Sequence, residues 1–256
     1  MNKYIDLNCD MGESFGAWNM GADREVMPWV TSVNIACGYH AGDPVTMRAT
    51  VRAAMEAGVA LGAHVALPDL MGFGRRAMAV SPGDLHAMTI VQMGALVAMA
   101  RSEQGRVGHL KPHGALYHMA ESEPDLAEAI VSAVASLDPD VRIVGLAGGM
   151  LVARAREAGL ACAEEGFVDR RYQQDGSLEP RGTQGAVIEN PEQALEQALA
   201  LARDGQAPLA EGGHVRVRAD TLCVHGDRDN AAEFARTIHE GLRKAGVELR
   251  ALGPES

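Results

Sequence analysis

The chain has 256 residues, of which 47% are hydrophobic and 22% charged, and this length and apolar content suit one large domain. The formal net charge of −11, with no cluster of Lys or Arg, argues against a nucleic acid or an anionic membrane as the partner and favours a small molecule. The first residues lack a secretory apolar stretch and no later run of 18 apolar residues occurs, so we expect a cytoplasmic protein without a membrane span.

Short apolar runs alternate with amphipathic stretches along the chain, which is typical of consecutive β/α units. We expect strands at 4–8, 32–37, 59–63, 107–112, 141–146, 160–164 and 221–224. We expect helices at 22–30 (interrupted at Pro28), 44–57, 81–105, 124–137, 149–158, 191–203 and 229–245. Residues 214–219 could form a hairpin arm, and residues 247–252 could be an eighth strand or a tail.

Capping residues mark several of these helices. Asp43 precedes Pro44 at the start of the helix 44–57, and Gly58 stands where that helix should end. Asn190 opens a capping box before the helix 191–203. We therefore expect Asp43 to cap a helix rather than to act in catalysis.

Seven β/α units in sequence predict a parallel sheet with right-handed crossovers, either closed as a barrel or open and doubly wound. We favour a TIM-like (β/α) barrel of about seven strands that forms a single domain over residues 1–256. Polar residues follow at least five different strands, and such residues converge at the mouth of a barrel, whereas an open sheet concentrates its site at a switch point.

Four apolar runs end on a histidine, and these are His40, His64, His113 and His225. If each run is a buried parallel strand, its carboxyl end opens onto the face where such folds build their binding sites. The pattern predicts one convergent polar site.

Two strands carry polar side chains on the face that should point into the barrel. These residues are Asp6, Asn8, Asp10, His109, Lys111 and His113. An acidic strand and a basic strand inside one barrel could satisfy each other. Asp6 and His109 lie deeper and could belong to a purely structural network, whereas Asp10, Lys111 and His113 lie nearer the mouth and are candidates for function.

Other polar residues lie in segments that could reach the same mouth. The long loop 65–80 contains Arg75 and Arg76, which could close over an anionic ligand or could be solvated. The segment 165–181 offers Glu165, Asp169, Arg170, Tyr172 and Arg181. Asp169 could be a structural ion pair with its neighbours, but its place beyond a strand end favours the site, and His225 with Asp227 follows the last strand.

Histidines and carboxylates around one cavity could supply a metal site or general acid and base groups. Asp10, His64 and His113 could hold a divalent ion. However, His109 and His113 would be about 13 Å apart on a strand, so their spacing does not establish a metal site. The sequence contains neither a G-x-x-x-x-G-K-[ST] phosphate loop nor a G-x-S-x-G elbow.

Six segments together resemble the LamB/YcsF family: DLNCDMGESFGAW, VNIACGYHAGDP, GAH with GFGRR, HLKPHGALYH, FVDRRYQQDGSLEPRG and LCVHGD. They extend from about residue 5 to residue 230. One departure is Val65-Ala66-Leu67, where the family pattern would place a Pro-containing turn after His64. The resemblance implies a barrel related to those of glycoside hydrolases and deacetylases. It also implies hydrolysis of the lactam 5-oxo-L-proline to L-glutamate with ATP and with partner subunits B and C.

Combining the residues with the resemblance, we expect ATP and Mg²⁺ to bind a partner subunit or a shared site. We expect Asp10 and His113 to act as base and acid and Lys111 to stabilise negative charge, with His64 as a further catalytic residue. The expected substrate-binding residues are Glu13, His40, Arg75, Asp169, Arg170 and His225.

Two alternatives remain from the sequence. A free-standing metal-dependent deacetylase or amidohydrolase would hold a metal and would need neither ATP nor partners. A non-catalytic subunit would bind a ligand without turning it over.

Overall fold

Parallel strands form a closed barrel in this computed structural model, which describes residues 4–226 and 230–253. The barrel strands are β1 (Tyr4–Met11), β2 (Ser32–Ala36), β3 (Ala60–Val65), β4 (Val107–Pro112), β5 (Arg142–Leu146), β6 (Cys162–Phe167) and β9 (Thr221–Val224). Each strand pairs with the next in this order, and β9 pairs back with β1. The expected TIM-like barrel of about seven strands is therefore confirmed.

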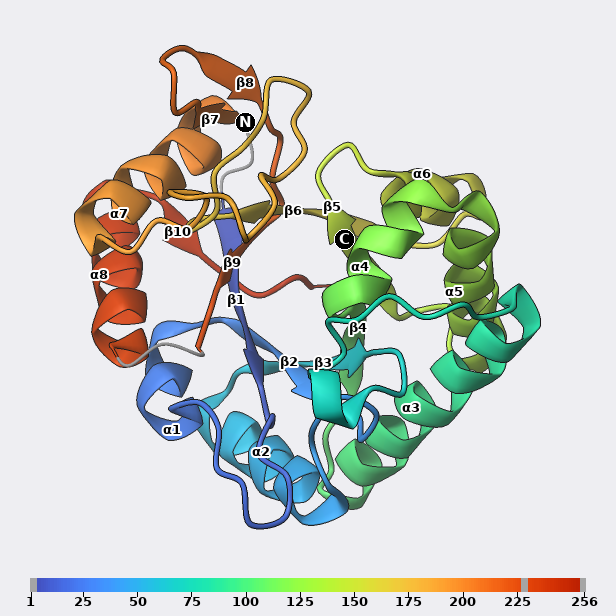
Figure 1. The fold of residues 1–256 in the computed structure, drawn as a ribbon. Helices are drawn as coiled ribbons and strands as arrows, with labels where there is room; N and C mark the ends of the chain where they lie inside the picture. Colours follow the sequence, from blue (N-terminus) through green and yellow to red (C-terminus); the bar gives the residue numbers. More distant parts are fainter. Residues whose placement is uncertain (1–3, 227–229, 254–256) are drawn as a thin grey trace.

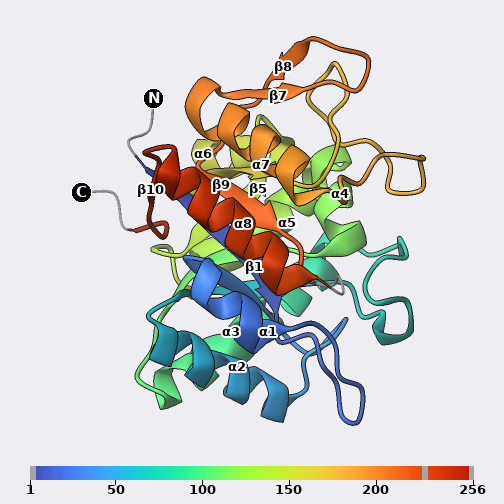
Figure 2. The same ribbon diagram turned by 90° about the vertical axis from the view of Figure 1, so that its left-hand side faces the viewer.

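Helices surround the strands on the outside (Figure 1). They are α1 (Asp23–Val26), α2 (Pro44–Ala57), α3 (Pro82–Ser102), α4 (Gly114–Ser122), α5 (Pro124–Leu137), α6 (Met150–Glu157), α7 (Pro191–Leu199) and α8 (Ala231–Lys244). Figure 2 shows α8 lying across the outer side of β1, with α1 and α7 next to it, and both of these helices contact α8. Short helical turns at Met27–Trp29, Leu70–Gly72 and Ala200–Asp204 complete the described helical segments.

The expected caps are present. Oδ1 of Asp43 accepts hydrogen bonds from the backbone N–H groups of Val45 and Thr46, and Gly58 ends α2 in the left-handed conformation with φ 69°. The Oδ1 atom of Asn190 caps α7 in the same way. Asp43 is therefore a helix cap, as predicted, and these local signals set where the helices begin and end.

Helix α4 is not predicted from the sequence. It begins directly after β4 at Gly114, whose φ is 56°. Its N-cap residue, His113, makes no side-chain capping hydrogen bond, so the signal that marks α2 and α7 is missing here. The consequence is that His113 sits at a strand-to-helix turn instead of in an irregular loop.

Two uncertain segments near the carboxyl terminus are now defined. The strand β8 (His214–Arg216) pairs antiparallel with β7 (Gln206–Pro208), which confirms the hairpin arm. The strand β10 (Glu248–Leu249) pairs with the first two described residues of β1, ahead of the part of β1 that pairs with β9. The barrel therefore closes without β10.

The alternation expected along β1 is present. Leu7 and Cys9 are fully buried in the apolar layer between strands and helices, whereas Asp6 and Asn8 are buried with polar partners from neighbouring strands. The inside of this barrel is consequently polar where branched aliphatic residues usually fill such folds.

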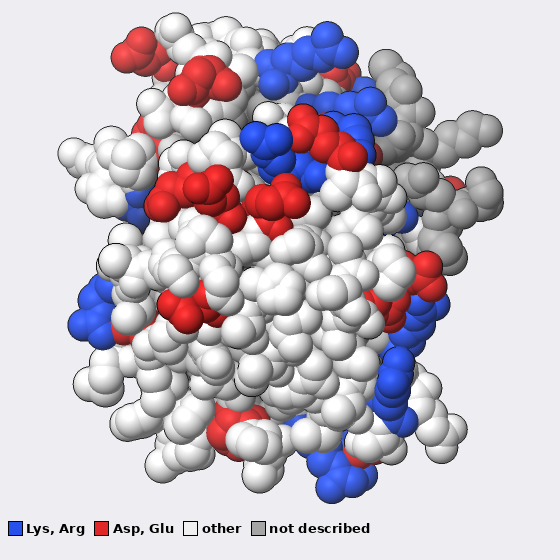
Figure 3. All heavy atoms as spheres, turned by 90° about the vertical axis from the view of Figure 1, so that its right-hand side faces the viewer, with Lys and Arg blue, Asp and Glu red and all other residues white. Residues whose placement is uncertain are grey.

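Helix α3 is long and apolar enough to span a membrane by length and composition. It packs on α5 and on β3 and β4, and Leu85, Met93 and Leu96 are fully buried there. On the side of the molecule that carries α3 and α5, charged groups are sparse in the centre (Figure 3). Part of the apolar character of α3 is therefore explained by the buried residues that pack on the barrel and on α5.

Gly62 on β3 provides a test of how closely the barrel interior is packed. A Cβ atom at Gly62 would lie 2.0 Å from Nε2 of His109 on β4, so we expect Gly62→Ala to lower the free energy of unfolding by about 2–3 kcal/mol through overpacking. Chemical denaturation would measure this. Gly94→Ala on α3 is the matched control, because no atom lies within 4 Å of its Cβ position, and it should be neutral or stabilising by up to about 1 kcal/mol.

Candidate active site

The carboxyl ends of the barrel strands bring the predicted polar residues together. Asp10 lies near the end of β1, His64 near the end of β3, and Lys111 near the end of β4, with His113 just beyond. His225 directly follows β9. The convergence predicted from the four histidine-terminated runs is thus observed at one mouth.

Beneath this mouth, a buried network fixes the inner polar side chains. Both carboxylate oxygens of Asp6 accept hydrogen bonds from the hydroxyl groups of Thr31, Ser32 and Thr221. Burial nevertheless raises the pKa of Asp6. Asp6 makes these contacts well below the mouth, so its role is structural.

Asn34 on β2 links this network to the mouth. Its Nδ2 donates to Oδ1 of Asn8 and to Oδ1 of Asp10, both at 2.8 Å, and its Oδ1 accepts from Nε2 of His109 at 2.7 Å. His109 is therefore also structural. Asn34 is not predicted from the sequence, because its role depends on the register between β1 and β2, which places Asn34 beside Asp10.

Lys111 is buried between two carboxylates. Its Nζ lies 3.1 Å from Oδ1 of Asp10 and 2.8 Å from Oε1 of Glu165, and only 3% of the side chain is exposed. Burial alone would lower the pKa of Lys111, but the negative charges of Asp10 and Glu165 raise it well above its usual value. The expected strand 160–164 stops one residue short of Glu165, so the sequence places Glu165 in the following segment and not inside the barrel, where the structure has it.

Asp10 is ionised by the same arrangement. Burial opposes the charge on its carboxylate, but His64 and Lys111 hold its pKa well below the ordinary value. Its Oδ2 lies 3.2 Å from Nε2 of His64, and about one sixth of the side chain is exposed (16%). Asp10 therefore carries a stable negative charge at the edge of the mouth.

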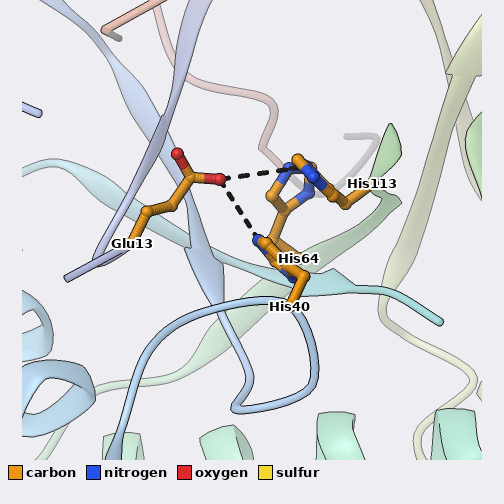
Figure 4. A group of neighbouring side chains, drawn as sticks. All are labelled: Glu13, His40, His64 and His113. Atoms are coloured by element: carbon orange, nitrogen blue, oxygen red, sulfur yellow. Dashed lines mark hydrogen bonds and ion pairs between the residues drawn. The ribbon is translucent and has the colours of Figure 1, made fainter. Parts of the chain in front are cut away.

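Three histidines and one glutamate gather around one point (Figure 4), and one of them, His64, contacts Asp10. Oε1 of Glu13 lies 3.2 Å from Nε2 of His40 and 3.8 Å from Nδ1 of His113, while Nε2 of His64 lies 3.0 Å from Nδ1 of His113. Each of the four residues offers one ligand atom, and these atoms lie within 4.8 Å of one another. This group could hold a metal ion, and it includes His64 and His113 of the three predicted candidate ligands.

Burial keeps two of these histidines neutral. It is the largest cause lowering the pKa of His40 and of His113 well below the usual value, and neighbouring histidines add to the effect. The rings of His40 and His113 stack with centroids 3.9 Å apart. Neutral imidazoles are the form that binds metal ions.

The loop after β3 closes over this group. Phe73, at φ 54°, places its ring against His40 and His113, and its carbonyl oxygen lies 2.8 Å from Nε2 of His113. Arg76 pairs with Asp69 within the loop, so Arg76 is a structural residue. Neither Asp69 nor Phe73 is predicted as a partner, because both act through folding of the loop on itself.

A cavity of about 490 Å³ opens at the mouth. The residues singled out from the sequence that line it are Asp10, His64, Arg75, Lys111, His113, Arg170, Arg181 and His225. Tyr117 and His118 of α4 also line it. The unpredicted helix α4 thus supplies part of the cavity wall.

The remaining predicted residues lie around the cavity rather than on it. Glu13 and His40 belong to the histidine group, and with Phe73 and Arg75 they line a second depression on the other side of the loop. Asp169 accepts a hydrogen bond from Nδ1 of His225 at 2.8 Å and so orients that ring. Asp227 lies outside the described residues.

The comparisons with known proteins agree with this architecture. Residues 5–256 match the LamB/YcsF family. The chain is 51% identical over 251 residues to the A subunit of 5-oxoprolinase from Bordetella pertussis, covering 98% of this chain and all of that protein. It is also similar to the crystal structure of a lactam utilization protein from Thermus thermophilus, at 46% identity and a TM-score of 0.93, covering 97% of this chain and all of that one.

A more distant likeness concerns the fold alone. A family 4 carbohydrate esterase from Streptomyces lividans shares 13% identity with this chain at a TM-score of 0.51, with 99% of both chains covered. This likeness agrees with the barrel fold described above.

Lys111→Met tests the buried charge balance. Removing the ammonium group leaves the buried carboxylate of Glu165 and the mostly buried carboxylate of Asp10 without their cation, so we expect a loss of about 3–5 kcal/mol in the free energy of unfolding at pH 7. The folded-state pKa of Asp10 is depressed, so its contribution is present above the unfolded pKa and disappears as the pH falls. The difference between wild type and variant should therefore shrink towards acidic pH in denaturation experiments.

Lys244→Met is the control for this substitution, because Lys244 is exposed at the end of α8. It should change the free energy of unfolding by no more than about 0.5 kcal/mol. Equal losses for the two variants, or a loss for Lys111→Met that is independent of pH, would contradict the assigned charge balance.

Proposed function

This chain belongs to the LamB/YcsF family, and we propose that it hydrolyses the lactam 5-oxo-L-proline to L-glutamate, driven by ATP and together with partner subunits B and C. The observation that carries the proposal is the small cationic cavity above the ionised pair of Asp10 and Lys111. The Bordetella relative is named as the A subunit of 5-oxoprolinase, and this name supports both the substrate and the membership of a complex. A cytoplasmic location follows from the use of ATP.

The cavity suits a small anion. Four cationic side chains, those of Arg75, Lys111, Arg170 and Arg181, outnumber the two carboxylates of Asp10 and Glu179 in its lining, although the chain as a whole is acidic. Arg170 is buried, and its Nε has no hydrogen-bond partner among the described residues. In this proposal an arginine of the cavity binds the carboxylate of 5-oxoproline, since guanidinium groups match carboxylate geometry.

A lactam amide is unreactive, which gives ATP its role. Transfer of a phosphoryl group to the lactam oxygen makes the ring carbon more electrophilic. Water then adds to this carbon, the bond from carbon to nitrogen breaks, and the nitrogen takes a proton. A second water releases phosphate from the resulting acyl phosphate. The chain has no phosphate loop, so ATP with Mg²⁺ would bind at a partner subunit or at a shared site.

The residues at the mouth have distinct roles in this proposal. Lys111 stabilises negative charge that develops on the substrate oxygen. Asp10 is ionised because its pKa lies well below the ordinary value, so in this proposal it is the base that accepts the hydrogen bond and then the proton of the attacking water. His64 contacts Asp10, and both His64 and His113 line the cavity. These two histidines complete the proposed catalytic group.

A second candidate function is a metal-dependent amidohydrolase that acts alone. The group of Glu13, His40, His64 and His113 favours it, because such ligands could hold a metal that activates water. That enzyme would hydrolyse amides without ATP and without partner subunits.

Reconstitution separates these possibilities. We expect coupled consumption of ATP and 5-oxoproline by the chain mixed with subunits B and C, and none by the chain alone. Amide hydrolysis by the chain alone would favour the second candidate. Ligand binding without turnover in any mixture would favour a non-catalytic subunit.

Asp10→Asn in the reconstituted complex tests the mouth itself. Asparagine keeps the shape of aspartate but loses the charge that orients His64 and Lys111, so we expect kcat to fall about 100-fold or more. Asp125→Asn, at an exposed position in the first turn of α5, is the control and should keep full activity. Unchanged turnover in a folded Asp10→Asn complex would remove Asp10 from the mechanism.

A further inference from the structure

The hydrogen-bond partners of His64 fix its tautomer. Its Nδ1 lies 3.0 Å from the carbonyl oxygen of Lys111. A carbonyl oxygen only accepts hydrogen bonds, so Nδ1 carries the hydrogen atom. In the neutral ring, Nε2 of His64 is therefore a bare lone pair, and it faces Oδ2 of the ionised Asp10 at 3.2 Å as well as Nδ1 of His113.

His113 is fixed in the other tautomer, with the hydrogen atom on Nε2 instead of Nδ1. Its Nε2 lies 2.8 Å from the carbonyl oxygen of Phe73, so Nε2 carries the hydrogen atom and Nδ1 of the neutral ring is the bare lone pair. This Nδ1 lies 3.0 Å from Nε2 of His64. Two lone pairs that face each other at this distance repel unless a cation lies between them.

Glu13 and His40 supply two further ligand atoms at the same point. Nε2 of His40 lies 3.2 Å from Oε1 of Glu13, and the same oxygen lies 3.8 Å from Nδ1 of His113. In a tetrahedral zinc site, neighbouring ligand atoms are about 3.3 Å apart. Three of the six separations, at 3.0, 3.2 and 3.8 Å, scatter around that value, and all six lie within 4.8 Å.

From these contacts we propose that Glu13, His40, His64 and His113 bind one divalent transition-metal ion of the Zn²⁺ class. Three imidazole nitrogens and one carboxylate oxygen are ligands that suit such an ion and do not suit Mg²⁺ or Ca²⁺. All four residues are buried, so solvent does not screen the repulsion between the facing nitrogen lone pairs. A cation must lie between them, and in this proposal the cation is the metal ion instead of a proton.

The surrounding structure orients two of the three imidazole ligands in the way that metal sites require, whereas Nδ1 of His40 is buried without a hydrogen-bond partner among the described residues. Metal-binding histidines usually donate their other N–H to a carbonyl or carboxylate, which orients the ring. The carbonyl groups of Lys111 and Phe73 do this for His64 and His113. Gly74 permits the loop to approach, because a Cβ there would lie 2.8 Å from Cδ2 of His113 and 2.9 Å from Cβ of His40.

The full chain, stripped with a chelator and dialysed against ZnCl₂, should retain one equivalent of Zn²⁺ by mass spectrometry. Loading with Co²⁺ should give the strong visible absorption of a tetrahedral ion. Glu13→Gln keeps the size of the side chain and removes the charged ligand, so its affinity for Zn²⁺ should fall at least about tenfold in competition with a chelator. His113→Ala should lose stoichiometric binding.

His86→Ala on α3 is the matched control, because it removes one histidine outside the cluster, and it should keep one equivalent. Circular dichroism would verify that each variant is folded. Retention of less than about a tenth of an equivalent by the wild type would overturn the proposal, since the cation would then be a proton. Equal weakening in Glu13→Gln and His86→Ala would also overturn it.

This measurement uses neither ATP, lactam nor partner subunits. A failure to bind Zn²⁺ would therefore leave the proposed lactam hydrolysis untouched. Conversely, an inactive complex whose chain retains Zn²⁺ would leave the metal site standing.

Discussion

The ammonium group of Lys111 is the charge on which the polar interior of this barrel depends. It lies within 3.1 Å of carboxylate oxygens from both Asp10 and Glu165. Two buried carboxylates without a cation would be strongly unfavourable. With it, Asp10 stays ionised and reaches His64, and the backbone carbonyl of Lys111 holds the other nitrogen of the same ring. One residue thus sets both the charge of the mouth and the tautomer of His64.

The loop between β3 and α3 is the second determinant of the site. Its internal pair of Asp69 and Arg76 shapes a tight bend that directs the Phe73 carbonyl towards His113. The backbone carbonyl of Gly74 accepts a hydrogen bond from Ala115 at the start of α4. Helix α4 and the loop around Phe73 are therefore joined by this hydrogen bond, although neither the helix nor the contacts of this loop are predicted from the sequence. Together they form one wall of the cavity and cover the histidines.

Local patterns in the sequence are sufficient to predict part of this structure. The period of two along β1 and β4 predicts which side chains face inward, because that property needs only the strand itself. The four histidines at strand ends likewise predict that a polar site lies at one mouth of the barrel, because each strand end can be recognised from its own segment. The place of Asn34 and of Glu165 inside the barrel is not predicted, since their partners are set by strand registers between distant segments. Phe73 fixes the tautomer of His113 through its backbone carbonyl, and the identity of its side chain does not reveal this contact.

His64 and His113 connect the two parts of the site. Both line the cationic cavity, and both lie next to Glu13 and His40, which line the second depression. Arg75 lines the cavity and the second depression alike. A substrate anion held by the arginines would therefore lie against the same imidazoles that the histidine group orients. Four cationic side chains, those of Arg75, Lys111, Arg170 and Arg181, line this opening in an otherwise acidic chain, which favours the entry of small anions over cations.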